Sequence, residues 1–331
     1  MAKTKDMKNK GPQAVICVGE LLVDFMAEGN APDAGKADRF VKSPGGAMAN
    51  VAFGLARLGE NSRFVGQVGS DPFGTYLKDV LAKEGVDVRW LSVSSEYPTG
   101  LVFVVLDNNK VPKYCFFGNP SADMMLEAKR IGPGLMEGAA FLHSGTVSMV
   151  RDPARSTTFE LMRRAKASGV KISFDPNLRL HLWKDHDHLR QIAKDALRLA
   201  DVAKLSRDEL FFITDASDLR EGARRVFELG PEIVVVTLGH EGAYYYCSEG
   251  EDNVPPFKVE VVDTTGAGDG FAAGLLHGLC REDWPLSLPA LEDAVRFASA
   301  VGGLATTGIG AVWSLPDEKR AQEFLESYSE R

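Results

Sequence analysis

The sequence predicts an α/β fold, a doubly wound and mostly parallel sheet with helices on both faces, together with a small β unit. Short, continuously apolar runs such as 14–19 and 233–237 alternate with segments of helical length, which is typical of strands buried on both faces of a parallel sheet. Between 99 and 117 this alternation is interrupted. Two apolar runs flank a turn at Asp107-Asn108-Asn109, a pattern that predicts a hairpin without an intervening helix.

Length and charge narrow the class of protein. A chain of 331 residues is long enough for one large α/β domain or a domain with a subdomain. The net charge of −8 argues against a nucleic-acid or anionic-membrane partner. The apolar segment 14–27 carries Glu20 and Asp24, which excludes a signal peptide or a membrane span. Residues 1–11 are basic and polar, and we expect a disordered tail.

The cysteines predict a compartment. The four are far apart, form no Cys-x-x-Cys pair and sit in apolar or aromatic contexts: Cys17, Cys115, Cys247 and Cys280. This usage predicts buried free thiols in a reducing environment, so we expect a cytoplasmic protein.

The N-terminal half is predicted to begin with a strand, a β excursion and a helix. In chain order the expected elements are a strand at 14–19, a hairpin excursion at 25–42, a helix at 51–58, a strand at 63–69, a helix at 73–84 and the hairpin formed by 100–106 and 111–117. Gly59 and Gly85 follow the two helices, as is typical of helix C-termini. The excursion and the later hairpin are expected to form the small β unit together.

The C-terminal half resumes the alternation. Strands are expected at 140–147, 170–175, 201–205 and 233–237, helices at 153–168, 187–200 and 218–229, a β excursion from 244 to 259, and a long helix at 291–305. Ligands of such sheets bind beyond the carboxyl ends of the strands, and the loops that follow these strands are therefore the candidate site.

One stretch near the C-terminus has the composition of an anion site. An apolar run, Val259 to Val262, predicts the end of a strand; three glycines and a small-residue helix follow it. Unpaired N–H groups at a helix N-terminus attract anions, and glycine lets the backbone come close to them. Asp269 lies inside this turn, where its carboxylate would repel a phosphate. Asp269 is therefore predicted to be a base that removes a proton from an attacking hydroxyl, the alternative being a helix N-cap.

Polar residues also follow the other predicted strands. They are Asp24, Gly45-Gly46 with Asn50, Asp175 to Arg179, Ser206 to Glu209, and Thr237 to Gly239. Each alone is typical of a cap or a turn, but together they indicate hydroxyl- and phosphate-binding groups around one cleft. The sequence has no P-loop, no dinucleotide Gly-x-Gly-x-x-Gly after the first strand, no protein-kinase signature and no Gly-x-Ser-x-Gly elbow. The histidines between 181 and 188 do not share a helical face, so we expect a solvated loop and helix cap rather than a metal site.

Two segments carry a resemblance to a known family. Gly45 to Asn50 and Asp263 to Asp269 are similar to the two signature regions of the PfkB, or ribokinase-like, carbohydrate kinases, and the resemblance extends from about 14 to 320. Within the family, Asp175 to Leu180 and Asn119 to Met124 look most like fructokinases. The resemblance implies the ribokinase-like fold, with 22–42 and 97–118 as a β lid and 12–21, 43–96 and 119–331 as the core.

The resemblance also implies roles for individual residues. Asp269 would be the catalytic base, and the backbone of Gly266, Ala267 and Gly268 would form an anion hole for the transferred phosphoryl group. The residues implied to hold the sugar are Asp24, Gly45, Gly46, Asn50 and Arg179, with Asp269. Those implied to bind ATP and Mg²⁺ are Ser206, Glu209, Thr237, Gly239, Gly242, Gly268 and Ala298. A monovalent cation, K⁺, would lie among Asp263, Thr265, Ala305, Gly308, Gly310 and Ser314.

The chain departs from the family pattern at two positions. Ser206 replaces the Asn of the Asn-x-x-Glu motif, and Gly118 stands where similar fructokinases have an Arg. The resulting hypothesis is an ATP- and Mg²⁺-dependent sugar kinase acting on fructose, with a homodimer through the lid. The alternatives are a 2-keto-3-deoxygluconate kinase, a ribose or ribosyl-nucleoside kinase and, from a different class, a non-catalytic sugar-binding regulator.

Overall fold

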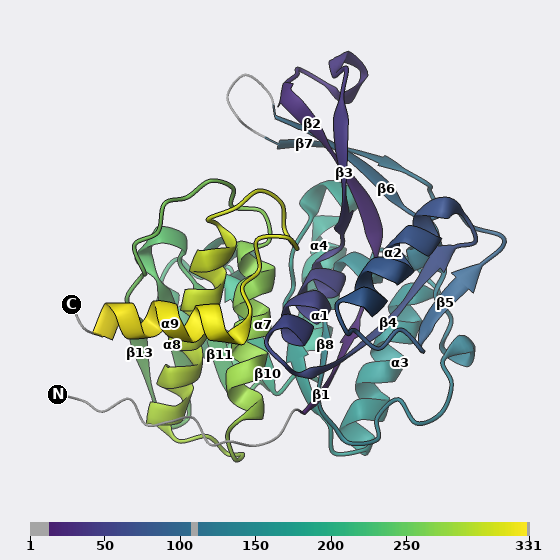
Figure 1. Cartoon of the computed structure of the whole chain (residues 1–331). Coiled ribbons are helices and arrows are strands. Elements are labelled where there is room, and N and C mark those ends of the chain that lie inside the picture. The colour runs from purple at the N-terminus through teal and green to yellow at the C-terminus, as the bar shows by residue number, and fades with distance from the viewer. Residues whose placement is uncertain (1–12, 107–111, 330–331) are drawn as a thin grey trace.

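The main feature of the computed structural model, which describes residues 13–106 and 112–329, is a nine-stranded sheet. Its order is β13-β12-β11-β10-β9-β8-β1-β4-β5 (Figure 1), and all neighbours from β11 to β5 are parallel. The strands are β1 (Ala14–Val18), β4 (Asn61–Gly69), β5 (Leu91–Ser94), β8 (Ala139–Ser144), β9 (Lys171–Phe174), β10 (Val202–Ser206), β11 (Ile233–Thr237), β12 (Ala243–Cys247) and β13 (Gly250–Val254). The antiparallel β12 and β13 complete one edge.

Helices cover both faces of this sheet, which confirms the predicted doubly wound class. One core contains side chains of α1 (Ala47–Arg57), α2 (Pro72–Lys83), α7 (Ala267–Cys280), α8 (Leu288–Ala305) and α9 (Glu318–Ser329). The other contains side chains of α3 (Ala154–Ala167), α4 (His186–Leu197), α5 (Arg207–Thr214) and α6 (Leu219–Phe227). Strand residues alternate between the two cores, because successive side chains point to opposite faces: Val15 and Cys17 enter the first, and Ile16 and Val18 the second.

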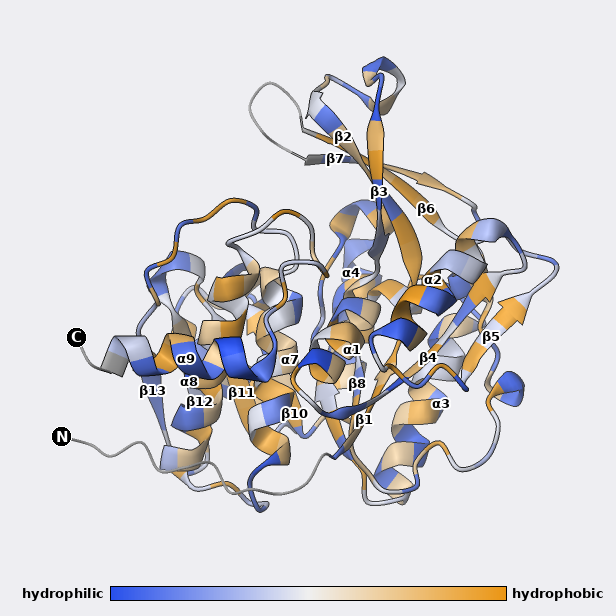
Figure 2. Ribbon diagram, viewed as in Figure 1, coloured by the Kyte–Doolittle hydropathy of each residue, from blue (hydrophilic) through white to orange (hydrophobic). Residues whose placement is uncertain are grey.

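A second, four-stranded sheet projects from the carboxyl-terminal edge of the first (Figure 1). It has the order β3-β2-β6-β7, from β2 (Leu22–Asn30), β3 (Phe40–Gly45), β6 (Leu101–Leu106) and β7 (Pro112–Phe117). Phe103 packs at ring-centroid distances of 4.9 Å from Phe25, 5.0 Å from Phe40 and 5.3 Å from Phe117. Figure 2 shows β6 as a mostly apolar strand. This is the predicted small β unit; the predicted tail and the turn at 107–109 lie outside the described residues.

One predicted strand is absent from its expected place. Val259 to Val262 form no strand, and Val261 and Val262 are each 57% exposed. The N–H groups of Val262 and Asp263 instead donate to the carbonyl of Thr306. The prediction was wrong because an apolar run forms a strand only where a neighbouring strand can take up its hydrogen bonds.

Among the strands and α-helices of the described residues, three were not predicted: β5, α5 and α9. A signal for α5 was present, because Ser206-x-x-Glu209 is a capping box, in which each residue satisfies an unpaired N–H of the other.

All four cysteines are free. Cys17 and Cys280 are buried as expected, whereas Cys247 is only partly buried. Cys115 is exposed, because it lies on the small sheet rather than in a core. Among residues 13–106 and 112–329, no helix combines the length and apolarity that crossing a bilayer requires.

Candidate active site

The N-terminus of α7 packs closely against a neighbouring segment. Gly266 is the residue before the helix and has φ +81, the left-handed region that favours glycine. A Cβ at position 266 would lie 2.7 Å from Ala311 Cα. Along α7, Gly270, Gly274 and Gly278 have no side chain to separate α7 from α8, so the two helices approach closely. Ala298 is fully buried at this contact, against Gly274.

Asp269 is joined to the other signature segment. Asn50, in the first half of α1, donates from Nδ2 to Asp269 Oδ2 at 2.7 Å across 219 residues of sequence. Asn50 is 5% exposed and its Oδ1 has no partner among the described residues. Burial raises the pKa of Asp269, whereas the Asn50 hydrogen bond and the nearby Lys204 lower it. The carboxylate is thus fixed in position and has a pKa above its ordinary value.

Asp24 lies beside the same carboxylate. It follows the start of β2, and its side chain occupies the space that a Cβ on Gly45 would take. Burial, with a smaller contribution from Asp269, raises the pKa of Asp24 to about 7, and Arg179 opposes this shift. Gly46 has φ +105 and a Cβ there would collide with the carbonyl of Glu20. The structure therefore brings Asp24, Gly45 and Asn50 to Asp269, while Arg179 approaches from an exposed loop.

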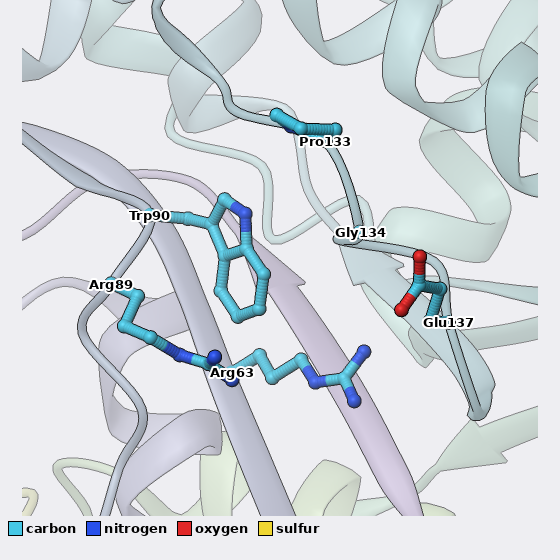
Figure 3. A pocket seen from close by; sticks show the side chains of 6 residues that line it. All are labelled: Arg63, Arg89, Trp90, Pro133, Gly134 and Glu137. Carbon is cyan, nitrogen blue, oxygen red and sulfur yellow. The ribbon is translucent and has the colours of Figure 1, made fainter.

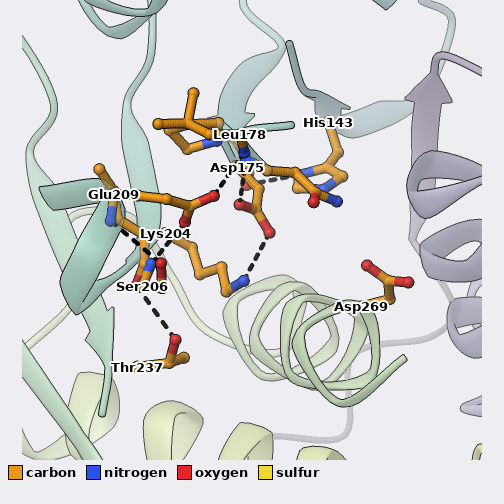
Figure 4. Close-up of polar contacts among 12 residues, drawn as sticks. His143, Asp175, Leu178, Lys204, Ser206, Glu209, Thr237 and Asp269 are labelled. Atoms are coloured by element: carbon orange, nitrogen blue, oxygen red, sulfur yellow. Dashed lines mark hydrogen bonds and ion pairs between the residues drawn. The ribbon is translucent and has the colours of Figure 1, made fainter. Parts of the chain in front are cut away.

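A second polar cluster lies on the other side of the α7 turn (Figure 4). Lys204 Nζ contacts Asp175 Oδ2 at 2.7 Å, and Asp175 Oδ1 accepts from the N–H of Asn177 at 3.1 Å. Glu209 accepts from the N–H groups of Leu178, at 2.7 Å, and Ser206, at 2.8 Å. Asp175 and Glu209 were expected near the site, but Lys204 was missed, although a lysine within an apolar strand was a visible signal.

The residues assigned to the nucleotide occupy neighbouring loops. Thr237 ends β11 and lies opposite Ser206 in the register of the two strands. Gly239 and Gly242 follow with φ +61 and +99, and there is open space within 4 Å of the Cβ position of Gly239. The Ser206 hydroxyl accepts from the N–H of Glu209 and caps α5. Ser206, which stands in place of the family's Asn, thus serves as the N-cap of α5.

Asp263 connects the two loops assigned to a cation. Its Oδ1 accepts from the N–H and hydroxyl of Thr265, at 2.9 and 2.6 Å, and its Oδ2 accepts from the N–H of Gly310 at 2.9 Å. Ser314 Oγ donates to the carbonyl of Gly310 at 2.5 Å. Backbone carbonyls and one carboxylate suit a hard cation such as K⁺. Among the described residues, no group of three His, Cys, Asp or Glu side chains could hold a metal ion. In the 181–188 segment, Asp185 is the N-cap of α4, as the predicted helix cap requires.

Several buried polar groups near this edge were not predicted. Glu20 is 2% exposed, Gln67 1% and Asp123 6%, and each has one side-chain oxygen without a partner among the described residues. Glu20 Oε1 accepts from the N–H of Ala47 at 2.7 Å, at the start of α1. Burial raises the pKa of Glu20 to about 7 from an ordinary 4.5, while this N–H bond opposes the shift.

The Glu20→Gln variant is expected to change how stability depends on pH. Between pH 4.5 and about 7 the folded protein holds a proton on Glu20 that the unfolded chain has lost, so the wild-type stability decreases as the pH rises. Gln does not titrate, and the variant should gain up to about 3 kcal/mol relative to wild type across this window. Urea unfolding at pH 4.5 and 8 measures the difference, with the exposed Glu137→Gln as control. An equal difference at both pH values would contradict the assignment.

A surface pocket away from Asp269 shows no comparable arrangement (Figure 3). It lies near the beginning of β4 and β5 and is lined by Arg63, Arg89, Trp90, Pro133, Gly134 and Glu137. Arg89 forms an ion pair with Asp87 at 2.6 Å, and Arg63 donates to the carbonyl of Leu135 at 2.6 Å. Both guanidinium groups also lie over the Trp90 ring. The charges satisfy local partners, so the loops at the opposite, carboxyl-terminal edge remain the candidate site.

Comparison with known proteins identifies relatives along almost the whole chain. The pfkB family of carbohydrate kinases matches residues 12–318. The probable fructokinase-7 of Arabidopsis thaliana is 38% identical over 320 residues, covering 95% of this chain and 92% of that protein. The fructokinase of Klebsiella pneumoniae is 38% identical over 309 residues, covering 93% and 98%.

Solved structures agree with these matches. A fructokinase from Xylella fastidiosa with bound ATP has a TM-score of 0.88 at 32% identity, covering 96% of this chain and 99% of that one. A double mutant of the Vibrio cholerae O395 fructokinase, bound to fructose, ADP and a potassium ion, has a TM-score of 0.87 at 35% identity, covering 96% and 100%. An aminoimidazole riboside kinase from Salmonella enterica has a TM-score of 0.81 at 30% identity, covering 94% and 99%.

Proposed function

The chain belongs to the pfkB family of carbohydrate kinases, which are phosphotransferases with an alcohol group as acceptor. We propose that it transfers the γ-phosphoryl group of ATP to the terminal hydroxyl of D-fructose, forming fructose 6-phosphate. The observation that carries this proposal is the Asn50–Asp269 hydrogen bond of 2.7 Å. It joins the two signature segments of the sequence into one site. The choice of fructose rests on the fructokinases among the relatives.

Asp269 is the base in the proposed reaction. Its carboxylate accepts the proton of the sugar hydroxyl, the hydroxyl oxygen forms a bond to the γ-phosphorus, and the bond to the β–γ bridging oxygen breaks to release ADP. The N–H groups of Gly266, Ala267 and Gly268 are assigned to the negative charge on the transferred group. This assignment is supported by the place of Gly266 before α7 and of Gly268 in its first turn, where N–H groups have no intrahelical acceptor. The N–H of Ala267 also donates to the carbonyl of Thr264 at 3.2 Å.

The sugar is assigned to the side of Asp269 that faces the small sheet. Asp24 and Asn50 supply carboxylate and amide groups for its hydroxyls. Gly45 and Gly46 keep the adjoining backbone free of side chains, which leaves room for the Asp24 carboxylate and the Glu20 carbonyl. Arg179 is exposed and electrostatically close to Asp24 and Asp269, so we assign it to the sugar or the phosphate.

The nucleotide is assigned to the opposite side. Thr237, Gly239 and Gly242 surround the end of β11. Gly268 lies in the first turn of α7, and Ala298, on α8, packs against Gly274 of α7. We assign Mg²⁺ to the neighbourhood of Glu209. Both of its oxygens already accept N–H bonds, and their remaining lone pairs could hold a metal-bound water. K⁺ would be held by Asp263, Thr265, Ala305, Gly308, Gly310 and Ser314, which lie in the two loops joined by Asp263. Its charge would help to stabilise the negative charge held in the adjacent anion hole.

An ADP-release assay over a panel of sugars tests the substrate. We expect kcat/KM to be highest for fructose, above 2-keto-3-deoxygluconate, ribose and a ribosyl nucleoside. A higher value for a ribosyl nucleoside would favour the relationship to the riboside kinase. Sugar binding without ADP release would identify the non-catalytic regulator and contradict the proposal.

The Asn50→Ala variant is expected to need a higher pH for activity. The Asn50 amide stabilises the ionised form of Asp269, so its removal raises the pKa of this carboxyl. A hydrogen bond to a charged group contributes about 1.5–3 kcal/mol, which corresponds to a shift of the acidic limb of kcat by roughly one to two pH units. The pH profile of kcat at saturating fructose measures this. An unchanged limb with a reduced plateau would mean that Asn50 holds only the sugar.

The small sheet is assigned as a lid that closes over the sugar and excludes water. A contact between it and the core is already present, because the Tyr114 ring stacks on His181 at 5.4 Å.

The small sheet also exposes apolar side chains: Val41 (55%), Tyr114 (46%), Phe116 (37%) and Phe117 (54%). Exposed apolar groups gathered on one element are typical of an interface, and we assign this surface to a homodimer. Sedimentation should show a dimer for wild type and for Val93→Asp, which alters another exposed apolar residue, but a monomer for Phe117→Asp.

We place the protein in the cytoplasm. The four free thiols support this assignment, since an exposed cysteine such as Cys115 stays reduced in a reducing compartment. Cell fractionation with an antibody to the chain tests it, and recovery from an oxidising compartment would contradict it.

A further inference from the structure

Lys204 is a buried charge whose position follows from strand alternation. On β10, Val202 lies in the core that α7 and α8 cover, whereas Ala203 and Leu205 lie in the opposite core. Lys204 therefore points to the same face as Val202. Its side chain is 7% exposed. A lysine at this position of an otherwise apolar strand is directed at the N-terminal part of α7.

The Lys204 ammonium lies between Asp175 and the α7 turn (Figure 4). Nζ is 2.7 Å from Asp175 Oδ2 and 3.3 Å from the position of a Cβ on Gly268. Gly268 thus leaves the space next to the ammonium free. In the described parts of the chain, Asp175 is the hydrogen-bond acceptor that Nζ has. Since an ammonium carries three N–H groups, two of them are available to a ligand at this turn.

The surrounding charges keep Lys204 protonated. Burial disfavours the charged form, but Asp175, Glu209 and Asp269 together raise the pKa of Lys204 above its ordinary value. His143, on β8, which is separated from β10 by β9, does not compete as a cation, because burial and the Lys204 charge lower its pKa to about 3. The site therefore contains a permanent positive charge next to the assigned anion hole.

We propose that Lys204 is a further catalytic residue, whose ammonium contacts the γ-phosphoryl group of ATP during transfer and stabilises its negative charge, and that Asp175 is the positioning residue that holds it. This inference rests on the proposed function, because it needs phosphoryl transfer at the turn of Gly266 to Gly268. As the phosphoryl group moves from ADP to the sugar oxygen, its charge is spread over the equatorial oxygens. A fixed cation stabilises such charge more effectively in a water-excluded site than in solvent.

The alternative is that Lys204 and Asp175 form a purely structural ion pair. Burying two charges costs free energy that their attraction often fails to recover, and apolar replacements are frequently neutral or stabilising. A structural pair also needs no unused N–H groups beside a glycine. The two readings differ in what they predict for ligands, because only the catalytic one makes ATP binding depend on Lys204 more strongly than ADP binding.

The test compares Lys204→Met with Lys171→Met. Lys171 is the first residue of β9, at the end of this strand opposite to Asp175. It forms ion pairs with Asp201, at 3.2 Å, and Glu232, at 3.1 Å, so its substitution controls for losing a lysine from the sheet. We expect Lys204→Met to lower kcat by about 10²–10³-fold, as for loss of an oxyanion donor. In calorimetry with Mg²⁺, its affinity for a β,γ-imido ATP analogue should decrease roughly tenfold while that for ADP changes less than about twofold. Lys171→Met should resemble wild type in each measurement.

Two outcomes would overturn the proposal. They are a kcat within about threefold of wild type, and an equal loss of affinity for ADP and the ATP analogue. If Lys204→Met does not fold, Asp175→Asn is compared with Asp175→Asn/Lys204→Met, in which no charge is left unpaired. The double variant should be at least about tenfold slower, and equal rates would exclude a catalytic role. Activity of Asp269→Asn would contradict the proposed function itself, whereas an inactive Asp269→Asn with an active Lys204→Met would contradict this inference alone.

Discussion

The Asp269→Asn variant should lose between about 10² and 10⁴-fold in kcat, the range expected for removing a general base. Asn has nearly the same shape and can still accept the hydrogen bond of 2.7 Å from Asn50, but it cannot take the proton of the sugar hydroxyl. Its effect should therefore fall on turnover rather than on binding. Steady-state ADP release and calorimetry with ADP and fructose, measured on the same preparation, separate the two.

The exposed Asp208 provides a matched control. It lies in the first turn of α5, as Asp269 lies in the first turn of α7, so Asp208→Asn makes the same chemical change at another helix start. This variant should keep its full turnover. If Asp269→Asn retained more than a few per cent of wild-type kcat, Asp269 would not be the base. If its affinity for ADP also decreased strongly, the defect would be structural.

The Gly266→Ala variant should have the second largest effect. Residue 266 has φ +81, and a Cβ there would lie 2.7 to 2.9 Å from Ala311 atoms, two of them in the backbone. Neither segment can relieve this contact by a side-chain rotation, so the first turn of α7 must shift. Because the anion-hole donors belong to this turn, we expect kcat to fall by about 10²–10³-fold. The free energy of unfolding should decrease by about 1–3 kcal/mol, as for strained backbone.

The Gly85→Ala variant separates the effect of backbone strain from the effect of the contact with Ala311. Gly85 has φ +89 and nothing within 4 Å of its Cβ position, so alanine there adds backbone strain without a contact. We expect a loss of about 1 kcal/mol in stability with kcat unchanged. A kcat of Gly266→Ala as high as that of Gly85→Ala and of wild type would show that the turn tolerates displacement. The anion-hole assignment would then be wrong.

Local patterns predicted most of the fold. The apolar runs at β1 and β11 and the glycines after α1 and α2 are properties of short windows, and the structure has these elements where expected within a few residues. The hairpin of β6 and β7 was equally visible. Val259 to Val262 were misassigned, because whether an apolar run becomes a strand depends on whether another strand lies beside it.

The site divides in the same way. A glycine-rich helix start that carries a carboxylate, Asp269, could be recognised in the sequence, because glycine and a helix N-terminus impose their chemistry locally. The folded structure was needed to show that Asn50 reaches Asp269 across 219 residues, and that Lys204 pairs with Asp175 beside Gly268. These contacts depend on strand order, strand register and helix packing, which bring distant residues together. No local pattern in the sequence specifies these contacts, since each of them arises when distant segments of the chain pack together.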